Sequence, residues 1–556
     1  MSEERIWADE ADVLVIGAGA TGLPAAIAAR ENGASVLLIE ANFDVGGHAA
    51  ISGGNVPLGG GTSAQKRSGI ADSPDLLFSD LTDWSVVQPN GFPDYRYNDR
   101  EIIRAFADWS APTYEWLLEK SVIFIDKPID NLGALDTGNS APRVAHMAAM
   151  DWVQFQTGKA QPPERGPITS SGIGLVRPLE ATARKMGVRI LLNTKMTDLI
   201  REPGPDGRIL GVTCQQDDQT LDFLARKAVI LGTGGSTSNV NFRRIFDPRL
   251  TEEYCGVAGE PFTPQDASGE LAAMAIGASL WGALNQSAEF GAVISKAGRV
   301  GCQYGYANLA WQPGSPVFNL ARAIGLRVAD WQDVILVNQA GRRFYDETAG
   351  QYVANSYHGI PDYVPGSWRN AKDVAYQPSN FLNAALAGTG EARNGGGPIW
   401  AIFDSEAVTR EEWITQPPHV DIEEGFFFSG NTIEELAANI KNKYQQEAMP
   451  ADVLAETVAR YNGFVDKGED PDFDKPSPQY KIETPPFYAA WATPVIHDTR
   501  VGLRINAKCQ VVDLWGQVIH GLYCGGESAG GFSMHGLARC VVQGRIAGTE
   551  AAAEAI

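Results

Sequence analysis

Three glycines near the start of the chain carry its clearest chemical signal. Gly17, Gly19 and Gly22 follow a short apolar run, ADVLVI (11–16), and stand directly before a helical pattern, LPAAIAARENG. In this arrangement Gly17 permits a tight turn, Gly19 lets a ligand approach the backbone, and Gly22 lets the helix pack closely on the strand. Because the first amides of such a helix point at whatever lies in front of it, the segment suits a bound phosphate.

An acidic residue follows at the distance that this chemistry requires. The run SVLLIE (35–40) has the composition of a second strand and ends in Glu40. An acid about 20 residues after the glycines holds a ribose hydroxyl in dinucleotide sites. Strand, glycine turn, helix, strand and acid therefore predict a doubly wound α/β domain that binds a dinucleotide.

Further glycine-rich stretches indicate which dinucleotide is bound. Residues 41–61 contain VGGHAAISGGNVPLGGG, which could run beside a flat isoalloxazine ring and which a nicotinamide domain does not need. A later apolar strand ends in LGTGGS (231–236), and GLYCGGESAGGFSMHG (521–536) precedes a final helix of small residues. These stretches predict one FAD site assembled from both ends of the chain, with a middle segment inserted.

Composition excludes several other classes of protein. The chain has 556 residues, enough for more than one domain, and a formal net charge of −22. A surface of this charge, without a basic cluster, argues against nucleic acid. The first residues are acidic and polar, and no apolar run is long enough to span a membrane, so we expect a cytoplasmic protein without membrane insertion. Six scattered cysteines predict buried, reduced thiols, and the histidines show no metal-ligand spacing.

The motifs together resemble one flavoprotein family along nearly the whole chain. VLVIGAGATG, GGHAAISGGN, GTSAQKRSGIADSP, AVILGTGGSTSN, VILVNQAGRRFYDE, HDTRVGLRIN and GLYCGGES follow the order found in fumarate reductases, urocanate reductase and 3-ketosteroid dehydrogenases. The resemblance implies a doubly wound, Rossmann-like FAD-binding domain interrupted by an α+β capping domain. Its expected parts are an FAD-binding segment at 8–290, a capping domain at 291–490, and the returning FAD-binding segment at 491–556.

The resemblance also implies cofactor contacts. The adenosine half of FAD would lie against Gly17, Gly19, Gly22 and Glu40, the flavin near Gly47, His48, Ser52, Gly53 and Gly54, and the remainder against Gly234 and Glu527. Quinone-linked members attach FAD covalently to a histidine, and that position aligns with Gly47 here. We therefore expect noncovalent FAD, with the neutral imidazole of His48 near the flavin.

The substrate side departs from the reductases of this family. Those enzymes hold a carboxylate with arginines, because a guanidinium pairs with it in a bidentate manner. By alignment, Gln351 and Gly531 stand where two of these arginines would be, whereas His497 matches a substrate-binding histidine. Arg500 and Arg539 could compensate from shifted positions. The pattern favours a neutral ketone over a dicarboxylate.

Catalytic candidates come from two segments. Tyr352 lies beside the lost arginine and is a candidate base, and Tyr345 in the same segment is a candidate that could equally be a packing residue. His535 and Gly536 precede the final helix, so their amides could face the flavin or a substrate carbonyl. His497 completes the set.

Other aromatic residues allow both a functional and a structural interpretation. Tyr304, Tyr306 and Trp311 fit an aromatic packing cluster or a pocket lining. The helical spacing of Tyr114 favours a core residue. Gly530 replaces the tyrosine of steroid Δ1-dehydrogenases, which argues against that activity and leaves a smaller cyclic ketone or another activated alkane open.

The capping region carries two further helix predictions. An amphipathic helix is expected over 431–444, beginning at Asn431 and Thr432, and a second helix from about 451 is expected to end at Gly463.

Three functions remain open at this point. The first is an FAD-dependent dehydrogenase that forms a C=C bond next to a ketone and passes electrons to an external acceptor. The second is the reverse reaction, reduction of an enoate, fumarate-like or urocanate-like C=C bond. The third is a subunit that only relays electrons to a partner protein.

Overall fold

The structure is a computed structural model of the whole chain. It describes the chain apart from the following residues: 1–4, 84–97, 127, 131–139, 149–171, 205, 247–255, 258–262, 283–291, 296–297, 304–322, 324, 345, 349–397, 446, 494, 500, 533, 535 and 556.

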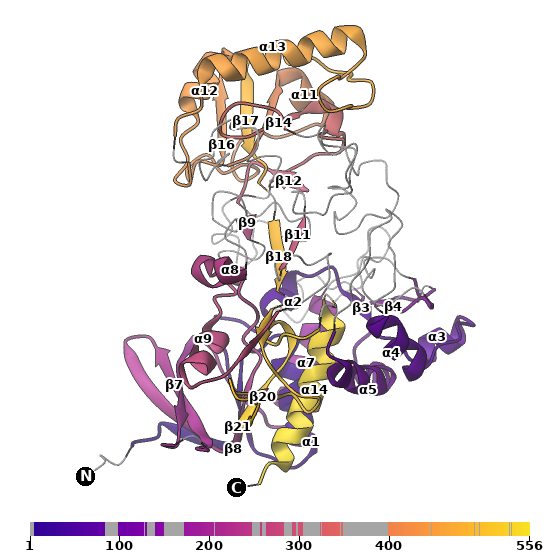
Figure 1. Ribbon diagram of the computed structural model, residues 1–556, viewed down its shortest axis with the longest axis vertical. Helices are drawn as coiled ribbons and strands as arrows, with labels where there is room; N and C mark the ends of the chain where they lie inside the picture. Colours follow the sequence, from indigo (N-terminus) through magenta and orange to yellow (C-terminus); the bar gives the residue numbers. More distant parts are fainter. Residues whose placement is uncertain are drawn as a thin grey trace.

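A largely parallel sheet joins the two ends of the chain (Figure 1). From edge to edge its strands are β20 (Gln510–Val512), β21 (Val518–Cys524), β8 (Gln219–Leu231), β1 (Asp9–Ile16), β2 (Val36–Ile39) and β5 (Arg189–Leu191). Strand β1 lies between β2 and β8, parallel to both, and β21 adds to β8 in parallel. Because the strand order turns at β1, a crevice forms beyond the carboxyl ends of these strands. The predicted α/β class is confirmed.

Two antiparallel strands extend this sheet. β6 (Thr194–Arg201) pairs with β7 (Ile209–Gln216), which pairs with the first half of β8. The second half of β8 is the part that contacts β21. The long strand β8 therefore links an antiparallel meander to the nucleotide-binding sheet.

Close helix packing fixes the first helix to the last. α1 (Gly22–Glu31) lies against α14 (Leu537–Ala553). Gly544 and Gly548 face α1, and a Cβ at either would lie 2.2 Å from the carbonyl oxygen of Thr21 or Ala25 respectively. Two glycines four residues apart thus let the helix backbones touch, since residues at this spacing share one face.

A second body of structure is formed by residues from the middle of the chain. Its antiparallel sheet has the order β14 (Ile335–Val337), β15 (Trp400–Asp404), β17 (Phe487–Trp491) and β16 (Phe427–Gly430). Helices α11 (Ser405–Arg410), α12 (Ile433–Asn439) and α13 (Ala451–Lys467) accompany it (Figure 1). Its buried residues form their own hydrophobic clusters, separate from the cluster that surrounds β1. This arrangement agrees with an inserted α+β capping domain; its expected limits stay a prediction.

The strands β11 (Ala292–Ser295) and β18 (Val495–Thr499) connect these bodies. β11 pairs antiparallel with β18, and β9 (Gly256–Val257) pairs with β18 in parallel. β11 lies where the chain leaves the first body and β18 where it returns, so both crossings belong to one small sheet (Figure 1).

The helix predictions for the middle segment need correction. α13 continues through Gly463 to Lys467, and Gly468 ends it in the left-handed region with φ +69°. The apolar residues Leu454, Val458 and Phe464 are buried along one face, and their packing outweighs the modest helix penalty of one glycine. α12 begins as expected, with Thr432 accepting a hydrogen bond from the Glu435 amide at 3.1 Å, but it already ends at Asn439.

The GTSAQKRSGIADSP segment has a structural explanation. Thr62 and Gln65 form a capping box at the start of α3 (Ser63–Arg67). Buried Asp72 accepts hydrogen bonds from the Gly60 amide, from Gln65, and from Nε and Nη2 of Arg143 at 2.9 Å each. Arg143 is fully buried, and its guanidinium holds the pKa of Asp72 below its ordinary value against the opposing effect of burial. This ion pair fixes the loop from Gly60 to Asp72.

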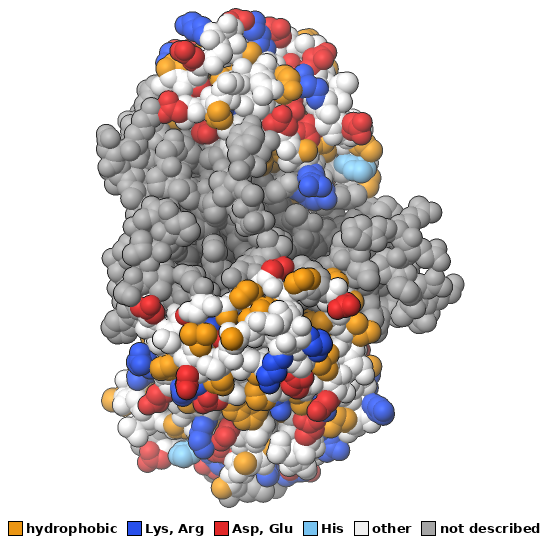
Figure 2. All heavy atoms as spheres, turned by 90° about the vertical axis from the view of Figure 1, so that its right-hand side faces the viewer, with side chains coloured by type: hydrophobic (Ala, Val, Ile, Leu, Met, Phe, Trp, Pro, Cys, Tyr) orange, Lys and Arg blue, Asp and Glu red, His pale blue; other side chains and the backbone are white. Residues whose placement is uncertain are grey.

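The described surface carries charges of both signs. On the face drawn in Figure 2, acidic and basic side chains are interspersed over both bodies. In the part of the chain that the structure describes, no helix has the length and apolar character needed to cross a membrane.

Candidate dinucleotide site

The glycine turn after β1 has no space for side chains at two of its three glycines. Gly17 has φ +95°, and a Cβ there would lie 2.3 Å from the Gly232 carbonyl oxygen. A Cβ at Gly22 would lie 1.7 Å from the Gly17 carbonyl oxygen. The ends of β1 and β8 and the start of α1 therefore touch through backbone atoms.

Gly19 differs from its two neighbours in this turn. A Cβ there would meet only the Gly46 carbonyl oxygen at 3.6 Å, which is an ordinary contact. Gly19 also lines a cavity of about 410 Å³ at the carboxyl ends of the parallel strands. Its missing side chain leaves room for a ligand rather than for the protein.

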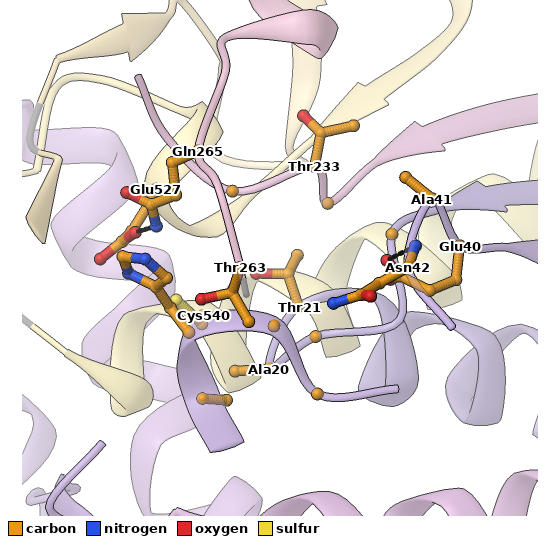
Figure 3. A pocket seen from close by; sticks show the side chains of 18 of the residues that line it. Ala20, Thr21, Glu40, Ala41, Asn42, Thr233, Thr263, Gln265, Glu527 and Cys540 are labelled. Atoms are coloured by element: carbon orange, nitrogen blue, oxygen red, sulfur yellow. Dashed lines mark hydrogen bonds between the residues drawn. The ribbon is translucent and has the colours of Figure 1, made fainter. Parts of the chain in front are cut away.

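The cavity is elongated, with polar groups at both ends. Figure 3 shows Glu40 and Asn42 at one end and Glu527, Gln265 and Cys540 at the other, with Ala20 and Thr21 between them. The ends come from β2 and from the glycine-rich segment after β21, so the cavity spans the strands on both sides of β1. This shape suits a ligand with two hydroxyl-bearing ends joined by phosphates.

Glu40 is held in place by backbone amides. Its Oε2 accepts a hydrogen bond from Ala18 at 2.6 Å, and its Oε1 accepts one from Asn42 at 2.9 Å. Burial raises the pKa of Glu40 above its ordinary value, although these amides oppose the rise. The carboxyl group is therefore fixed at the end of β2, where a ribose-binding acid is predicted.

Glu527 belongs to a hydrogen-bonded group at the opposite end. Gln265 donates from Nε2 to Glu527 Oε2, and its Oε1 accepts from Thr237 at 2.9 Å. Ser528 donates to the Gly234 carbonyl at 2.5 Å. Glu527 is thus held by Gln265, and its neighbour Ser528 is bound to Gly234.

The wall between these ends comes from α2 (Gly47–Ile51) and the start of α14. Gly47, His48, Ser52, Gly53 and Gly54 all line the cavity. Gly536, the N-cap of α14 with φ +91°, lines the cavity as well. The free amides of the first turn of α14 therefore lie at the cavity.

The structure brings together ten of the eleven predicted cofactor residues. All except Gly22 line the cavity, and Gly22 closes the turn behind it. The catalytic candidates Tyr345, Tyr352 and His535 lie outside the described residues, as do Arg500 and the aromatic residues 304, 306 and 311. His497 is in β18, whose backbone alone is described at that position. Tyr114 is a core residue that packs on Phe124, as expected.

The lining fits FAD. Phosphates would meet the amides at the start of α1 and the open face of Gly19, while the two carboxylates suit ribose and ribityl hydroxyls. Lys195, the one cation among the described lining residues, is paired with Asp266. No group of three or more His, Cys, Asp or Glu in the described chain is placed to hold a metal ion.

Several lining residues were missed from the sequence. They include Thr21, Asn42, residues 194–196 on β6, Gln265 and Cys540. Asn42 follows Glu40 closely enough to have been suspected. Residues 194–196 and Gln265 lie in segments without a glycine signal, and only the fold brings them to the cavity.

The turn before α14 has glycine at positions 530 and 531, both closely packed. A Cβ at Gly530 would lie 2.1 Å from the Trp281 carbonyl oxygen, and one at Gly531 would lie 3.3 Å from Ile102 and 3.4 Å from the Trp281 ring. Gly531 also has φ +78°. Trp281, at the end of β10 (Leu280–Trp281), thus fills the space on this side of the turn.

Arg539, an arginine near this turn, binds backbone carbonyl groups. It is 1% exposed, and its guanidinium donates to the carbonyl oxygens of Phe532 at 2.6 Å and Thr499 at 3.0 Å. The hypothesis that Arg539 reaches a substrate is therefore not supported by its geometry.

The doubly wound sheet, its glycine turn and the elongated cavity define a dinucleotide-binding protein of the FAD type. Residues 12–540 match the family described as FAD binding domain, and the chain belongs to this family. FAD is its cofactor.

Known relatives place it among oxidoreductases. It is 25% identical to a fumarate reductase (cytochrome) of Shewanella frigidimarina (strain NCIMB 400), over 98% of this chain and 74% of the relative. It is 27% identical to a 3-oxosteroid 1-dehydrogenase of Mycolicibacterium smegmatis (strain ATCC 700084 / mc(2)155), over 93% of this chain and 92% of the relative. The open conformation of a flavocytochrome c3 fumarate reductase has the same fold, with a TM-score of 0.64 and 23% identity over 98% of this chain and 79% of that one. The protein is an FAD-dependent oxidoreductase acting on CH–CH bonds.

Proposed function

We propose that the protein dehydrogenates a neutral, cyclic or steroid-like ketone to the α,β-unsaturated ketone. The observation that carries the proposal is the pair of glycines 530 and 531 packed on Trp281, together with the hydrogen bonds of Arg539 to two backbone carbonyls. A carboxylate substrate would meet no arginine among the described residues of this turn. The 3-oxosteroid 1-dehydrogenase relative, matched over 92% of its own length, supports the same direction.

The proposed chemistry divides between the cofactor and the protein. When bound, FAD accepts a hydride from the carbon β to the carbonyl. The α-proton leaves to a base, for which Tyr352 is the first candidate and Tyr345 the second. Gly536 and the following amides of α14 polarise the carbonyl oxygen, since they lie at the cavity and are not used within the helix. His497 and His535 are proposed to orient the ketone.

Two further expectations belong to the proposal. FAD is held noncovalently beside His48, so acid precipitation should release all of the flavin into the supernatant. Flavin that remains with the precipitated protein would contradict this arrangement. An external acceptor, whose identity the site does not specify, reoxidises the enzyme.

The decisive test is an anaerobic titration of the oxidised protein. Saturated cyclic ketones, steroid ketones and succinate are added separately while the visible flavin band is followed. Bleaching by a ketone but not by succinate is the expected result, and bleaching by succinate alone would refute the proposal.

The reverse reaction is the alternative, favoured by the fumarate reductase relative and by His497 in β18. Dithionite-reduced protein would then be reoxidised by fumarate, urocanate or an enone. Reoxidation by fumarate without bleaching by any ketone would replace the dehydrogenase with this reductase.

A further inference from the structure

Arg539 connects two segments that the proposed function places around the substrate. It lies in the first turn of α14, and its two terminal nitrogens donate to carbonyl groups in different parts of the chain. Nη1 binds Phe532 at 2.6 Å, within the turn that leads to Gly536, and Nη2 binds Thr499 at 3.0 Å, at the end of the strand that carries His497. One guanidinium thus joins both substrate-side segments.

The Thr499 end of β18 is also fixed from the FAD-binding side. The Ser236 amide donates to Thr499 Oγ1 at 2.9 Å, and Thr499 Oγ1 lies 3.5 Å from Gln265 Oε1. A Cβ at Gly235 would lie 2.0 Å from Thr499 Oγ1, so the strand end rests directly on the backbone. Gln265 in turn binds Glu527 in the cofactor cavity (Figure 3). The strand end is therefore placed relative to the FAD site.

His497, two residues before Thr499, occupies an irregular position in the pairing of β18 with β11. Val293 pairs with Asp498, but Ile294 pairs with Ile496, so His497 is the extra residue of a β-bulge between β11 and β18. A bulge bends its strand and redirects the backbone at the extra residue. The placement of His497 consequently depends on how firmly Thr499 is held.

A buried arginine in the first turn of α14 is energetically unfavourable. Arginine is rarely fully buried, and a cation in the first turn of a helix is disfavoured by the helix dipole. A guanidinium offers several donors in a fixed plane, so it can hold two carbonyls at a set separation, whereas a lysine ammonium is a point charge on a flexible chain.

We propose that Arg539 is a positioning residue that sets the distance between the His497 strand and the Gly536 turn, and so aligns substrate with flavin. This inference rests on the proposed function for its kinetic consequence, but not for its structural one. Arg539 itself does not reach the substrate.

The kinetic test uses Arg539→Lys, Arg539→Met and the control Arg545→Lys. Arg545 is on the same helix, but it stacks on Trp109 and Trp116, away from both segments. With whichever compound bleaches the flavin, we expect Arg539→Lys to lower the rate constant of flavin reduction about tenfold or more, because small displacements of reacting groups have effects of this size. FAD affinity should stay within about twofold, and Arg545→Lys should match the unaltered protein.

A second readout needs no substrate. Hydrogen–deuterium exchange of the holoprotein should accelerate in residues 495–499 and 530–536 for both Arg539 variants and not for the control. Unchanged exchange and an unchanged reduction rate would overturn the inference. A raised substrate KM with an unchanged reduction rate would overturn it too, since Arg539 would then bind substrate. If no compound bleaches the flavin, the proposed function fails, and the exchange data still decide the role of Arg539.

Discussion

The substitution Gly17→Ala tests the glycine turn because the added methyl group causes both backbone strain and a steric overlap. Gly17 has φ +95°, and an L-residue held in that region costs about 1–2 kcal/mol. The new Cβ would also lie 2.3 Å from the Gly232 carbonyl oxygen, and relieving such an overlap costs about 1–3 kcal/mol. We therefore expect the free energy of unfolding of the apoprotein to fall by about 2–5 kcal/mol.

Gly19→Ala is the matched substitution in the same turn. Its Cβ meets only the Gly46 carbonyl oxygen at 3.6 Å, so the free energy of unfolding of the apoprotein should change by less than about 0.5 kcal/mol. Because Gly19 lines the cavity, the methyl group takes space intended for the cofactor phosphates. The Kd for FAD should rise about tenfold or more, equivalent to about 1.4 kcal/mol.

Urea unfolding of flavin-free protein and titration with FAD separate the two effects. Unfolding is followed by circular dichroism, and FAD binding by the quenching of flavin fluorescence. Gly17→Ala with unaltered stability would refute the backbone contact between β1 and β8. Gly19→Ala with unaltered FAD affinity would refute the placement of phosphate at this glycine.

Three further predictions concern stability. Burial raises the pKa of Asp346 to about 6, so this carboxyl group favours folding below pH 4 and loses that contribution as the pH rises through 6. Asp346→Asn should therefore raise the free energy of unfolding by up to about 3 kcal/mol at pH 8 but little at pH 4. An equal gain at both pH values would contradict this prediction. Arg143→Met leaves Asp72 buried without its guanidinium partner and should lower the free energy of unfolding in urea by about 3–5 kcal/mol. Arg104→Ala removes an exposed ion pair and should lower it by less than about 1 kcal/mol. Similar losses for the two variants would argue against the buried ion pair. Gly463→Ala places a methyl in open space within α13 and should stabilise the protein by about 0.5–1 kcal/mol, so a loss of stability would show that the glycine is needed there.

The nucleotide-binding frame was predictable because its constraints are local. Gly22 and Glu40 contact backbone atoms of their own strand–helix–strand unit, whereas Gly17 also approaches the Gly232 carbonyl oxygen after β8. Gly234 and Glu527 were predicted from the resemblance to the flavoprotein family, whose glycine-rich segments contain both residues, and the structure places both at the cavity. Local sequence sufficed for the first turn, whereas the close contacts of Gly544 and Gly548 with α1 were not predicted.

The remaining contacts depend on the fold as a whole. Gln265 reaches the cavity because the chain crosses back after β8, and nothing in its own segment signals a ligand. Gly463 suggested a helix end, yet the buried stripe that includes Leu454 and Phe464 carries α13 past it. Arg539 was a candidate to compensate for a lost substrate arginine, whereas its guanidinium donates to carbonyl oxygens of two distant segments.

Strands from the beginning and the end of the chain, β1 and β21, lie on either side of β8, and this affects how the sheet forms during biosynthesis. β21 adds to β8 only after about 300 further residues have been made, which takes about 15–60 s at 5–20 residues per second. Throughout that time the edge of β8 and the α1 face that receives Gly544 and Gly548 have no partner from β21 or α14. The nascent chain therefore passes through a long stage with an open sheet edge, when a chaperone would have most to protect and FAD could not yet be enclosed.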